Sequence, residues 1–526
     1  MANTLSLGSG NWGAKESLLL GYYEDGKKFF PETFDVTRAT GGTRVNKNGL
    51  IETPAEIGSE LITNGNFATD SDWTLGSGWS ISNGKASCDG TQTSTSYCRQ
   101  TLPVTSGDTL RLTIDVIVDS GTFTILDGTS GVIVLSETES GSYSIVFDWS
   151  GSNGNLLLRA PNGFIGSIDN ISVKEYNDKN LARIDYSDDA KGALLTEPQS
   201  TNFVTYSQDF SISWIASNAN ITSNYKTSPD GDLNSSRFLS TNSAFLYKSF
   251  SLTIGSVHTI SFFAKSNGSL NNFFLHVNGN NSPTFTATDV WQRFEHTFTA
   301  VNTSHNIGIG NSTGGADLQI WGAQLEKENT LGYSGEYATS YIPTISQIQS
   351  RATDLVTNGG DVNSFGSEGV LYANIAALAN DEELRRISIN DGSTNNRVTL
   401  DFTTISNQVR GFITSNGATQ AILIGNTTVT NYFKLAVKYK ENDFSLWLNG
   451  VEVATDTSGN SPIGLSEISF DNGTTGSNIF FGKTKNIQAF NTALSDSDLL
   501  SLTTTGSVPY WKQYSAMATS LNYTNK

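Results

Sequence analysis

The chain is organised around two separated stretches: FDVTRAT at residues 34–40, which continues to residue 53, and LARIDY at residues 181–186, which continues to residue 203. Along the whole chain, short runs of Val, Ile, Phe, Tyr and Thr alternate with clusters of Gly, Asn, Asp and Ser. This alternation is typical of strands joined by turns. We therefore predict an all-β fold of tandem antiparallel β-sandwiches. The length of 526 residues indicates about three or four domains.

Taken together, the two stretches resemble one lead-in motif of bacteriophage tail and tail-fibre proteins. In that group the two halves usually lie close together, and a carbohydrate-binding-type jelly roll follows them. Here the residues between the halves resemble another jelly roll. We therefore expect a β domain to be inserted into the motif, with residues 33–56 and 177–203 lying near each other.

Two predicted domains share one plan. Residues 58–176 open with ELITNGNF at 60–67 and close with GSIDNISVK at 166–174, which resemble the first and last strands of carbohydrate-binding-module jelly rolls. Residues 177–345 carry the second half of the lead-in motif and then repeat the plan, with ADLQIWGAQLE at 316–326 as the closing strand. The resemblance implies two packed antiparallel sheets in each domain.

A third sandwich is predicted over residues 346–505. Asn449-Gly450 between two apolar runs is a strong hairpin signal, and Ser495 is a good N-cap for a short helix. This combination resembles laminin-G-like and concanavalin-like sandwiches.

Two terminal segments complete the predicted organisation. Residues 1–57 hold too few apolar residues for a core of useful size. We expect this segment to be an N-terminal anchoring or oligomerisation segment, packed on a neighbouring subunit or on the virion, or else a frayed extension. Residues 506–526 form a polar-aromatic tail that packs back, docks on a partner or is disordered.

The net charge of −18 argues against a nucleic-acid partner, because phosphate binding requires a basic surface. The N-terminus lacks the basic and apolar regions of a signal peptide. No run approaches the ~18 apolar residues of a membrane-spanning helix, so we expect no membrane insertion. These features fit a protein made in the host cytoplasm and located in the virion.

Cys88 and Cys98 lie on either side of a polar loop. They either face each other across a hairpin or are two reduced, buried thiols. The spacing decides neither alternative, and it matches no metal motif.

Sugar-binding sites on β-sandwiches use aromatic faces that stack on pyranose rings, with polar side chains binding the hydroxyls. In the first jelly roll, Trp79, Tyr97 and Trp149 are the candidates, with core packing as the alternative for each. In the second jelly roll, Trp214, Trp291 and Trp321 are available, and there core packing is the favoured interpretation.

The resemblance to carbohydrate-binding jelly rolls also implies a structural Ca²⁺. Asp169 fits the ligand on the last strand, and Glu60, Asn64 or Asn66 fits the ligands near the first strand. Carboxylate and carbonyl oxygens suit this hard cation. In the third sandwich, the loop residues Asp391, Asn395, Asp471 and Asn472 are weaker candidates for a Ca²⁺ and sugar site.

Catalytic motifs are poorly supported. GNSTG at residues 310–314 matches the nucleophile-elbow pattern, but it lies between two predicted strands instead of a strand and a helix. The four histidines fall on separate predicted strands. We therefore expect no enzymatic activity.

The resemblances imply a phage virion protein, such as a tail-fibre, spike or other appendage subunit, that binds host-surface glycans for adsorption. Its N-terminal segment would contact other virion proteins, and a closed homo-oligomer, with a trimer favoured, is expected for an appendage. Two alternatives stay open. One is a head-decoration or adaptor protein with purely structural sandwiches, and the other is a glycan-degrading enzyme.

Overall fold

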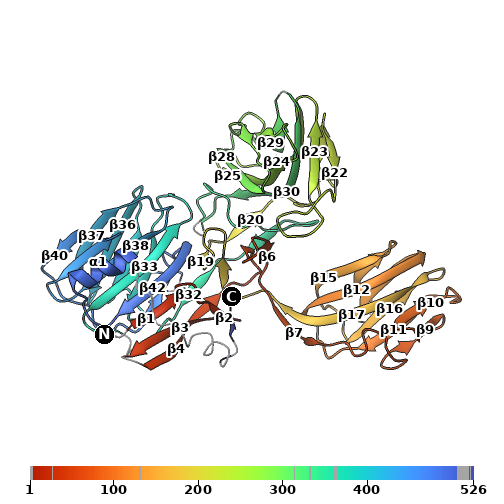
Figure 1. The fold of residues 1–526 in the computed structure, drawn as a ribbon, viewed down its shortest axis with the longest axis horizontal. Coiled ribbons are helices and arrows are strands. Elements are labelled where there is room, and N and C mark those ends of the chain that lie inside the picture. Colours follow the sequence, from red (N-terminus) through yellow and green to blue (C-terminus); the bar gives the residue numbers. More distant parts are fainter. Residues whose placement is uncertain are drawn as a thin grey trace. The chain divides into compact units, whose positions relative to one another are not determined.

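The computed structural model divides the chain into two compact units. The main unit comprises Met1–Pro54 and Lys179–Lys526, and the inserted unit comprises Ala55–Asp178. Strands dominate both units, which confirms the predicted all-β class of tandem antiparallel sandwiches (Figure 1). The structure describes residues 4–25, 28–128, 132–312, 314–330, 333–360, 365–474, 476–505, 521 and 523–525.

The inserted unit is a sandwich of two antiparallel sheets. The β12 sheet has the order β15 (Gly141–Asp148), β12 (Thr109–Ser120), β17 (Ile165–Asn177), β10 (Lys85–Cys88) and β9 (Trp79–Ser82), with β7 (Glu56–Glu60) beside β17. The β11 sheet has the order β14 (Val132–Glu137), β13 (Phe123–Asp127), β16 (Asn155–Ala160), β11 (Ser96–Thr101) and β8 (Thr74–Leu75).

Alternation along the strands builds the core of the inserted unit. On β12, Leu110, Leu112, Ile114 and Val116 are buried at every second position. They pack with residues from the β11 sheet in one hydrophobic cluster. Because side chains alternate across a strand, the intervening positions of both sheets face away from this core.

The main unit contains a second jelly-roll-like sandwich. One sheet has the order β21 (Ile215–Ser217), β24 (Ala244–Ser251), β29 (Ser304–Asn311), β26 (Asn272–Val277) and β27 (Phe285–Thr286). The other has the order β22 (Asn220–Thr222), β23 (Ser236–Ser240), β30 (Ala316–Lys327), β25 (Val257–Ser266) and β28 (Gln292–Thr299). Phe262 and Phe298 are buried in its core, and Trp321 is buried against Phe263 and Tyr341.

The C-terminal sandwich of the main unit combines a 13-stranded and a five-stranded sheet. The path of the larger sheet is β32 (Leu355–Thr357), β4 (Lys28–Thr37), β3 (Leu18–Asp25), β1 (Thr4–Gly8), β42 (Gly482–Phe490), β33 (Gly369–Ala377), β38 (Phe433–Tyr439), β39 (Phe444–Leu448) and β40 (Val451–Asp456). Four strands pair off this path: β2 (Gly13–Lys15), β18 (Arg183–Asp185), β19 (Ala193–Thr196) and β43 (Thr524–Asn525). The smaller sheet has the order β37 (Ala418–Asn426), β36 (Gln408–Ser415), β35 (Arg397–Phe402), β34 (Arg385–Asn390) and β41 (Glu467–Ser469).

The N-terminal segment differs from the expectation. β1 lies between β3 and β42, with Leu5 opposite Ala489, so the first strands complete the large sheet of the same chain. Leu5, Leu7 and Trp12 are buried in the core of the C-terminal sandwich. The few apolar residues of this segment therefore need no second subunit for their burial, because the distant C-terminal half supplies the partner surface.

Two local predictions in the C-terminal sandwich hold. Asn449 and Gly450 join β39 to β40 with φ angles of 48° and 85°, as a tight hairpin turn requires. The helix α1 (Asp496–Thr505) follows Ser495, whose Oγ accepts a hydrogen bond from the Asp498 amide at 3.3 Å. Within the described residues, no helix is long and apolar enough to span a bilayer. In the C-terminal tail, Tyr510, Trp511 and Tyr514 lie outside the described residues.

The two halves of the lead-in motif lie side by side in the main unit, which confirms the proximity expected of them. The Arg38 amide donates to Asn180 Oδ1 at 2.9 Å, and the Tyr186 amide donates to the Val45 carbonyl at 2.9 Å. We call residues 38–52 and 180–197 the collar. It contains the short pair β5 (Arg44–Val45) and β6 (Ile51–Glu52), and β20 (Ser200–Asn202), which pairs with β31 (Gln349–Arg351), follows it.

Candidate functional site

Two of the three aromatic candidates in the inserted unit are core residues. Trp79 and Trp149 are only 7% and 1% exposed and belong to the central hydrophobic cluster. Trp79 packs against Phe164, and Trp149 packs against Phe147. Their rings therefore hold the two sheets together, and core packing accounts for both.

Tyr97 instead lies on the outward face of the β11 sheet. Its strand neighbours Ser96 and Cys98 are buried, whereas Tyr97 is partly exposed. The register places Tyr97 opposite Arg159 of β16, and Arg99 opposite Leu157. Directly opposed residues have Cβ atoms about 5 Å apart, and diagonal neighbours lie about 7–8 Å apart. Tyr97, Arg99 and Arg159 therefore form one contiguous group, which we call the arginine face.

The two arginines of this face lack counter-ions. Among the described residues, neither Arg99 nor Arg159 has a carboxylate oxygen within 4.0 Å. Residues 55–178 contain five Lys or Arg and fifteen Asp or Glu. Like charges at neighbouring sheet positions repel each other. An anion bound at this face would relieve the repulsion between the two arginines.

The floor of the arginine face is apolar. Leu126 of β13 lies opposite Leu157 of β16, and Thr124 lies opposite Arg159. Leu126 and Leu157 are each 6% exposed, although neither belongs to the core cluster. Their burial means that surrounding groups cover them, whereas the ring of Tyr97 stays partly exposed.

The residues considered for Ca²⁺ are engaged in local structure. Glu60 accepts hydrogen bonds from the Ile62 and Val173 amides and the Ser172 hydroxyl, and Asn64 binds the loop at Thr69 and Ser71. Glu60 lies opposite Lys174 on β17, five residues from Asp169, or about 16 Å at the rise of a strand. The Asn66 side chain accepts the Ala68 amide. The described chain holds no group of three His, Cys, Asp or Glu residues suited to a metal ion.

Three of the four loop candidates of the C-terminal sandwich are likewise engaged locally, whereas Asn395 is exposed. Asp391 accepts hydrogen bonds from Ser393 and Asn396, and the Asn472 side chain accepts one from Arg386. Asp471 is buried and accepts the Gly473 amide at 2.9 Å, and burial raises its pKa.

The cysteines fit the second alternative. Cys88 and Cys98 are both free and buried, and they lie in different sheets of the inserted unit. Burial raises the pKa of Cys98 to about 12.

Ser312 of the elbow-like motif follows β29 and precedes β30, so it lies between two strands as expected. His258 and His305 are buried in the same sandwich. Burial lowers the pKa of His258 to about 4, which keeps this ring neutral. The arrangement therefore lacks the strand–turn–helix context that exposes a nucleophile.

A buried ion network ties the collar to the segment after the jelly roll. Arg183 binds Glu197 at 2.6 Å and also Asp354, while Arg38 binds Asp354 at 2.9 Å and Arg351 binds Glu197 at 3.0 Å. The side chains of all five residues are at most 4% exposed. These five residues are called the collar network.

Charge compensation decides the protonation of the network. Burial alone would raise the pKa of Glu197, but Arg351 and Arg183, together with Ser340, lower it to about 2. The pKa of Asp354 is likewise lowered, because the surrounding arginines outweigh its burial. The nearby Glu326 has hydroxyl and amide partners but no ion pair within the described part of the chain, and burial raises its pKa. The network is thus ionised in the folded state.

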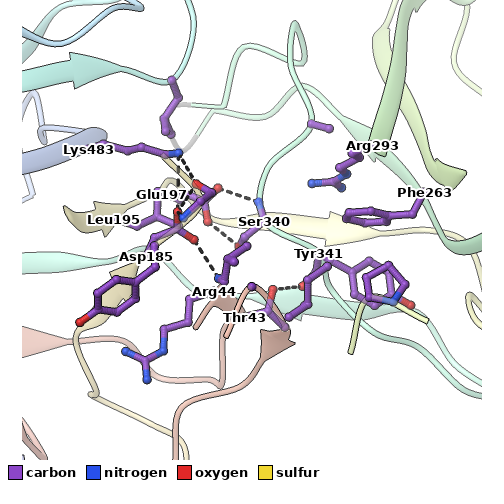
Figure 2. A pocket seen from close by; sticks show the side chains of 18 of the residues that line it. Thr43, Arg44, Asp185, Leu195, Glu197, Phe263, Arg293, Ser340, Tyr341 and Lys483 are labelled. Carbon is purple, nitrogen blue, oxygen red and sulfur yellow. Dashed lines mark hydrogen bonds and ion pairs between the residues drawn. The ribbon is translucent and has the colours of Figure 1, made fainter. Parts of the chain in front are cut away.

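A cavity of about 590 Å³ opens beside the collar network, within the main unit (Figure 2). Its wall is drawn from the collar, from the jelly roll and from the C-terminal sandwich. The residues that contribute most to its chemistry are Arg44, Asp185, Tyr186, Trp291, Arg293, Glu295, Tyr337 and Lys483. We call it the collar cavity. Trp291, for which core packing was the favoured interpretation, is partly exposed and lines this cavity.

The arginine face and the collar cavity depend on pairing between distant strands, so the sequence alone did not predict them. Arg99 and Arg159 are far apart in the chain, and only strand pairing brings them together. The alternation around Tyr97, with Ser96, Cys98 and Gln100 buried, was the available signal for an outward aromatic. The collar cavity has no single motif, because its wall comes from three parts of the chain.

No family model matches the chain, and comparison with curated proteins yields no match. Among solved structures, a leech intramolecular trans-sialidase matches with 16% identity and a TM-score of 0.23, over 28% of this chain and 24% of the enzyme. A tandem CBM22 domain from Paenibacillus barcinonensis matches with 12% identity and a TM-score of 0.20, over 52% of this chain and 98% of that one. Domain 4 of a Geobacillus stearothermophilus arabinanase, solved with arabinotriose, matches with 13% identity and a TM-score of 0.23, over 32% of this chain and 82% of the domain. Because these TM-scores are so low, we conclude nothing about this chain from these matches.

Proposed function

We propose that this chain is a glycan-binding protein of a phage appendage, and that the arginine face of the inserted unit binds acidic host-surface polysaccharide. The observation that carries the binding role is the grouping of Tyr97 with two ion-pair-free arginines on one outward sheet face. The split lead-in motif, which resembles that of phage tail proteins, supports the virion role. Binding, and no chemical step, is the activity proposed.

The chemistry of the arginine face selects an acidic glycan. A guanidinium binds a carboxylate through two parallel N–H donors, which neutral hydroxyls cannot match in strength. The partly exposed Tyr97 ring offers apolar surface to the CH groups of a pyranose ring. A polymer with repeating carboxylates would engage both arginines. Weak binding at each site is multiplied when many copies are displayed on one particle.

The test is a titration of the full chain with oligogalacturonate, an acidic probe, and with malto-oligosaccharide, a neutral probe of similar length. We expect Arg99→Ala and Arg159→Ala each to weaken oligogalacturonate binding about tenfold, the equivalent of ~1.4 kcal/mol. Tyr97→Ala is expected to weaken it, whereas Tyr97→Phe retains the ring and the affinity. Raising the salt concentration should also weaken binding, because exposed charges are screened.

Arg111→Ala is the matched control. Arg111 is an exposed arginine of the same unit, but it lies on β12 in the opposite sheet. The binding role of the arginine face is refuted if Arg111→Ala weakens binding as much as Arg159→Ala, or if the neutral probe binds as tightly as the acidic one. The virion role is tested separately, by mass spectrometry of purified particles for peptides of this chain.

A further inference from the structure

The collar cavity has the volume and wall chemistry of a small-ligand site, and we propose that it binds a neutral saccharide. Its volume of about 590 Å³ lies within the range of ~300–1,000 Å³ that is usual for such sites. It lies in the main unit, whereas the arginine face lies in the inserted unit, so the two sites are independent. This site extends the proposed function to a second ligand class.

The charges in the wall are already compensated. Lys483 lies 3.6 Å from Asp185, and Arg44 binds Glu52 at 2.8 Å. Glu197 is held by the arginines of the collar network. A charged ligand would have to compete with these pairs, so the wall favours an uncharged molecule over an acidic or basic one. Figure 2 shows Lys483 beside Asp185, and Glu197 directed toward Ser340.

The remaining charges in the wall also cancel. Arg293 and Glu295 lie two residues apart on β28, with opposite signs. The Arg293 guanidinium donates to the Thr339 carbonyl at 2.5 Å and lies over the Phe263 ring at 5.3 Å. Glu295 accepts the Ala338 amide at 2.9 Å. Both side chains are thereby held in place before a ligand arrives.

Unpartnered polar groups gather in the same wall. Tyr337 is 6% exposed, and its buried hydroxyl has no hydrogen-bond partner among the residues that the structure describes. Within the same residues, the buried hydroxyl of Tyr186 and the Nε of Arg293 also lack a partner. A buried polar group without a partner is destabilising. These three atoms are shielded from solvent, so a sugar hydroxyl would reach them only if neighbouring side chains move when the ligand binds.

Trp291 supplies the apolar part of the site. Its indole N–H donates to the Thr227 carbonyl at 3.3 Å, which restrains the ring, and the residue remains partly exposed at the cavity wall. A pyranose ring has CH groups on its faces and hydroxyls around its rim. A restrained aromatic ring next to hydrogen-bonding groups matches this pattern. A linear polyol has the hydroxyls without the apolar ring face, so we infer a cyclic sugar.

The test uses the full chain and three neutral disaccharides: maltose, lactose and N,N′-diacetylchitobiose. Binding is measured by saturation-transfer NMR and by the rise in melting temperature that a ligand of the folded state produces. We expect at least one disaccharide to bind with a Kd below about 10 mM. Ala338→Phe, which places a ring in the cavity wall, and Trp291→Ala should each weaken that binding at least tenfold.

Ala418→Phe is the matched control, since Ala418 is exposed at the start of β37 and does not line the cavity. It should leave disaccharide binding unchanged, as should the double variant Arg99→Ala/Arg159→Ala. The binding result is taken from a cavity variant whose circular dichroism spectrum matches that of the wild type. The proposal is overturned if none of the three disaccharides binds, or if binding survives both cavity variants. Loss of disaccharide binding in the double arginine variant would assign the sugar to the arginine face instead.

Discussion

Replacing Arg183 by methionine tests whether the collar network holds the main unit together. Arg183 is fully buried and binds both Glu197 and Asp354. Methionine fills part of the space but leaves each carboxylate with fewer cationic partners. Removing one member of a buried ion pair typically costs about 3–5 kcal/mol. Because Arg351 still pairs with Glu197 and Arg38 still pairs with Asp354, we expect a loss near the lower end of this range, about 3 kcal/mol.

The expected change in melting temperature follows from the size of the structure. The main unit comprises about 400 residues, and an unfolding entropy of about 2.1 cal/mol/K per residue means that a loss near 3 kcal/mol lowers its melting temperature by roughly 4 °C. The inserted unit has its own core, and the chain connects it to the main unit at residues 54/55 and 178/179. Its transition should therefore stay within about 1 °C of the wild-type value.

Differential scanning calorimetry measures both transitions, and hydrogen exchange with mass spectrometry assigns them to peptides of either unit. Arg237→Met is the matched control, because Arg237 binds Asp317 at 2.7 Å while both side chains stay partly exposed. An exposed pair of this kind contributes about 0–1 kcal/mol. The reasoning is refuted if Arg183→Met costs no more than Arg237→Met, or if both calorimetric transitions shift together.

Three further predictions concern protonation and packing. Because the folded pKa of Glu197 lies below its unfolded value, its contribution to stability is complete above the unfolded pKa and is lost as the pH falls toward 2. Urea titrations should show that the free energy of unfolding falls by about 2 kcal/mol less between pH 6 and pH 3 in Glu197→Gln than in the wild type. Equal decreases in the two proteins would contradict this. In the same assay, Leu5→Ala should lower the free energy of unfolding by about 3 kcal/mol, because Leu5 is fully buried. Leu500→Ala should lower it by less than about 1 kcal/mol, because the Leu500 side chain is 48% exposed. Similar losses in the two variants would count against the packing of β1. Burial raises the pKa of Cys98 to about 12. Iodoacetamide at pH 8 should therefore leave this thiol unmodified in the folded protein and modify it after unfolding. Modification of Cys98 in the folded protein would contradict its burial.

Local patterns were sufficient to predict the sandwiches. The hairpin at Asn449-Gly450 and the cap at Ser495 depend on neighbouring residues, and both hold in the structure. Alternation along WSIS at 79–82 also places Trp79 on the same face as the buried Ile81. That local signal favours the core role that Trp79 has in the structure.

Features that depend on distant pairing could not be predicted in the same way. β1 pairs with β42 near the other end of the chain, and no local signal identifies such a partner. Arg99 and Arg159 become neighbours only when β11 and β16 pair in one register. A shift of a single residue would place one of them on the core face, so the arginine face follows from the three-dimensional pairing.

The most direct test of the central claim is a crystal structure of the full chain soaked with oligogalacturonate. We predict a uronate carboxylate bound between Arg99 and Arg159, with a sugar ring against Tyr97 on the outward face of the β11 sheet. Density for the acidic sugar on the opposite sheet near Arg111, or in the collar cavity alone, would contradict the assignment of acidic-glycan binding to the arginine face.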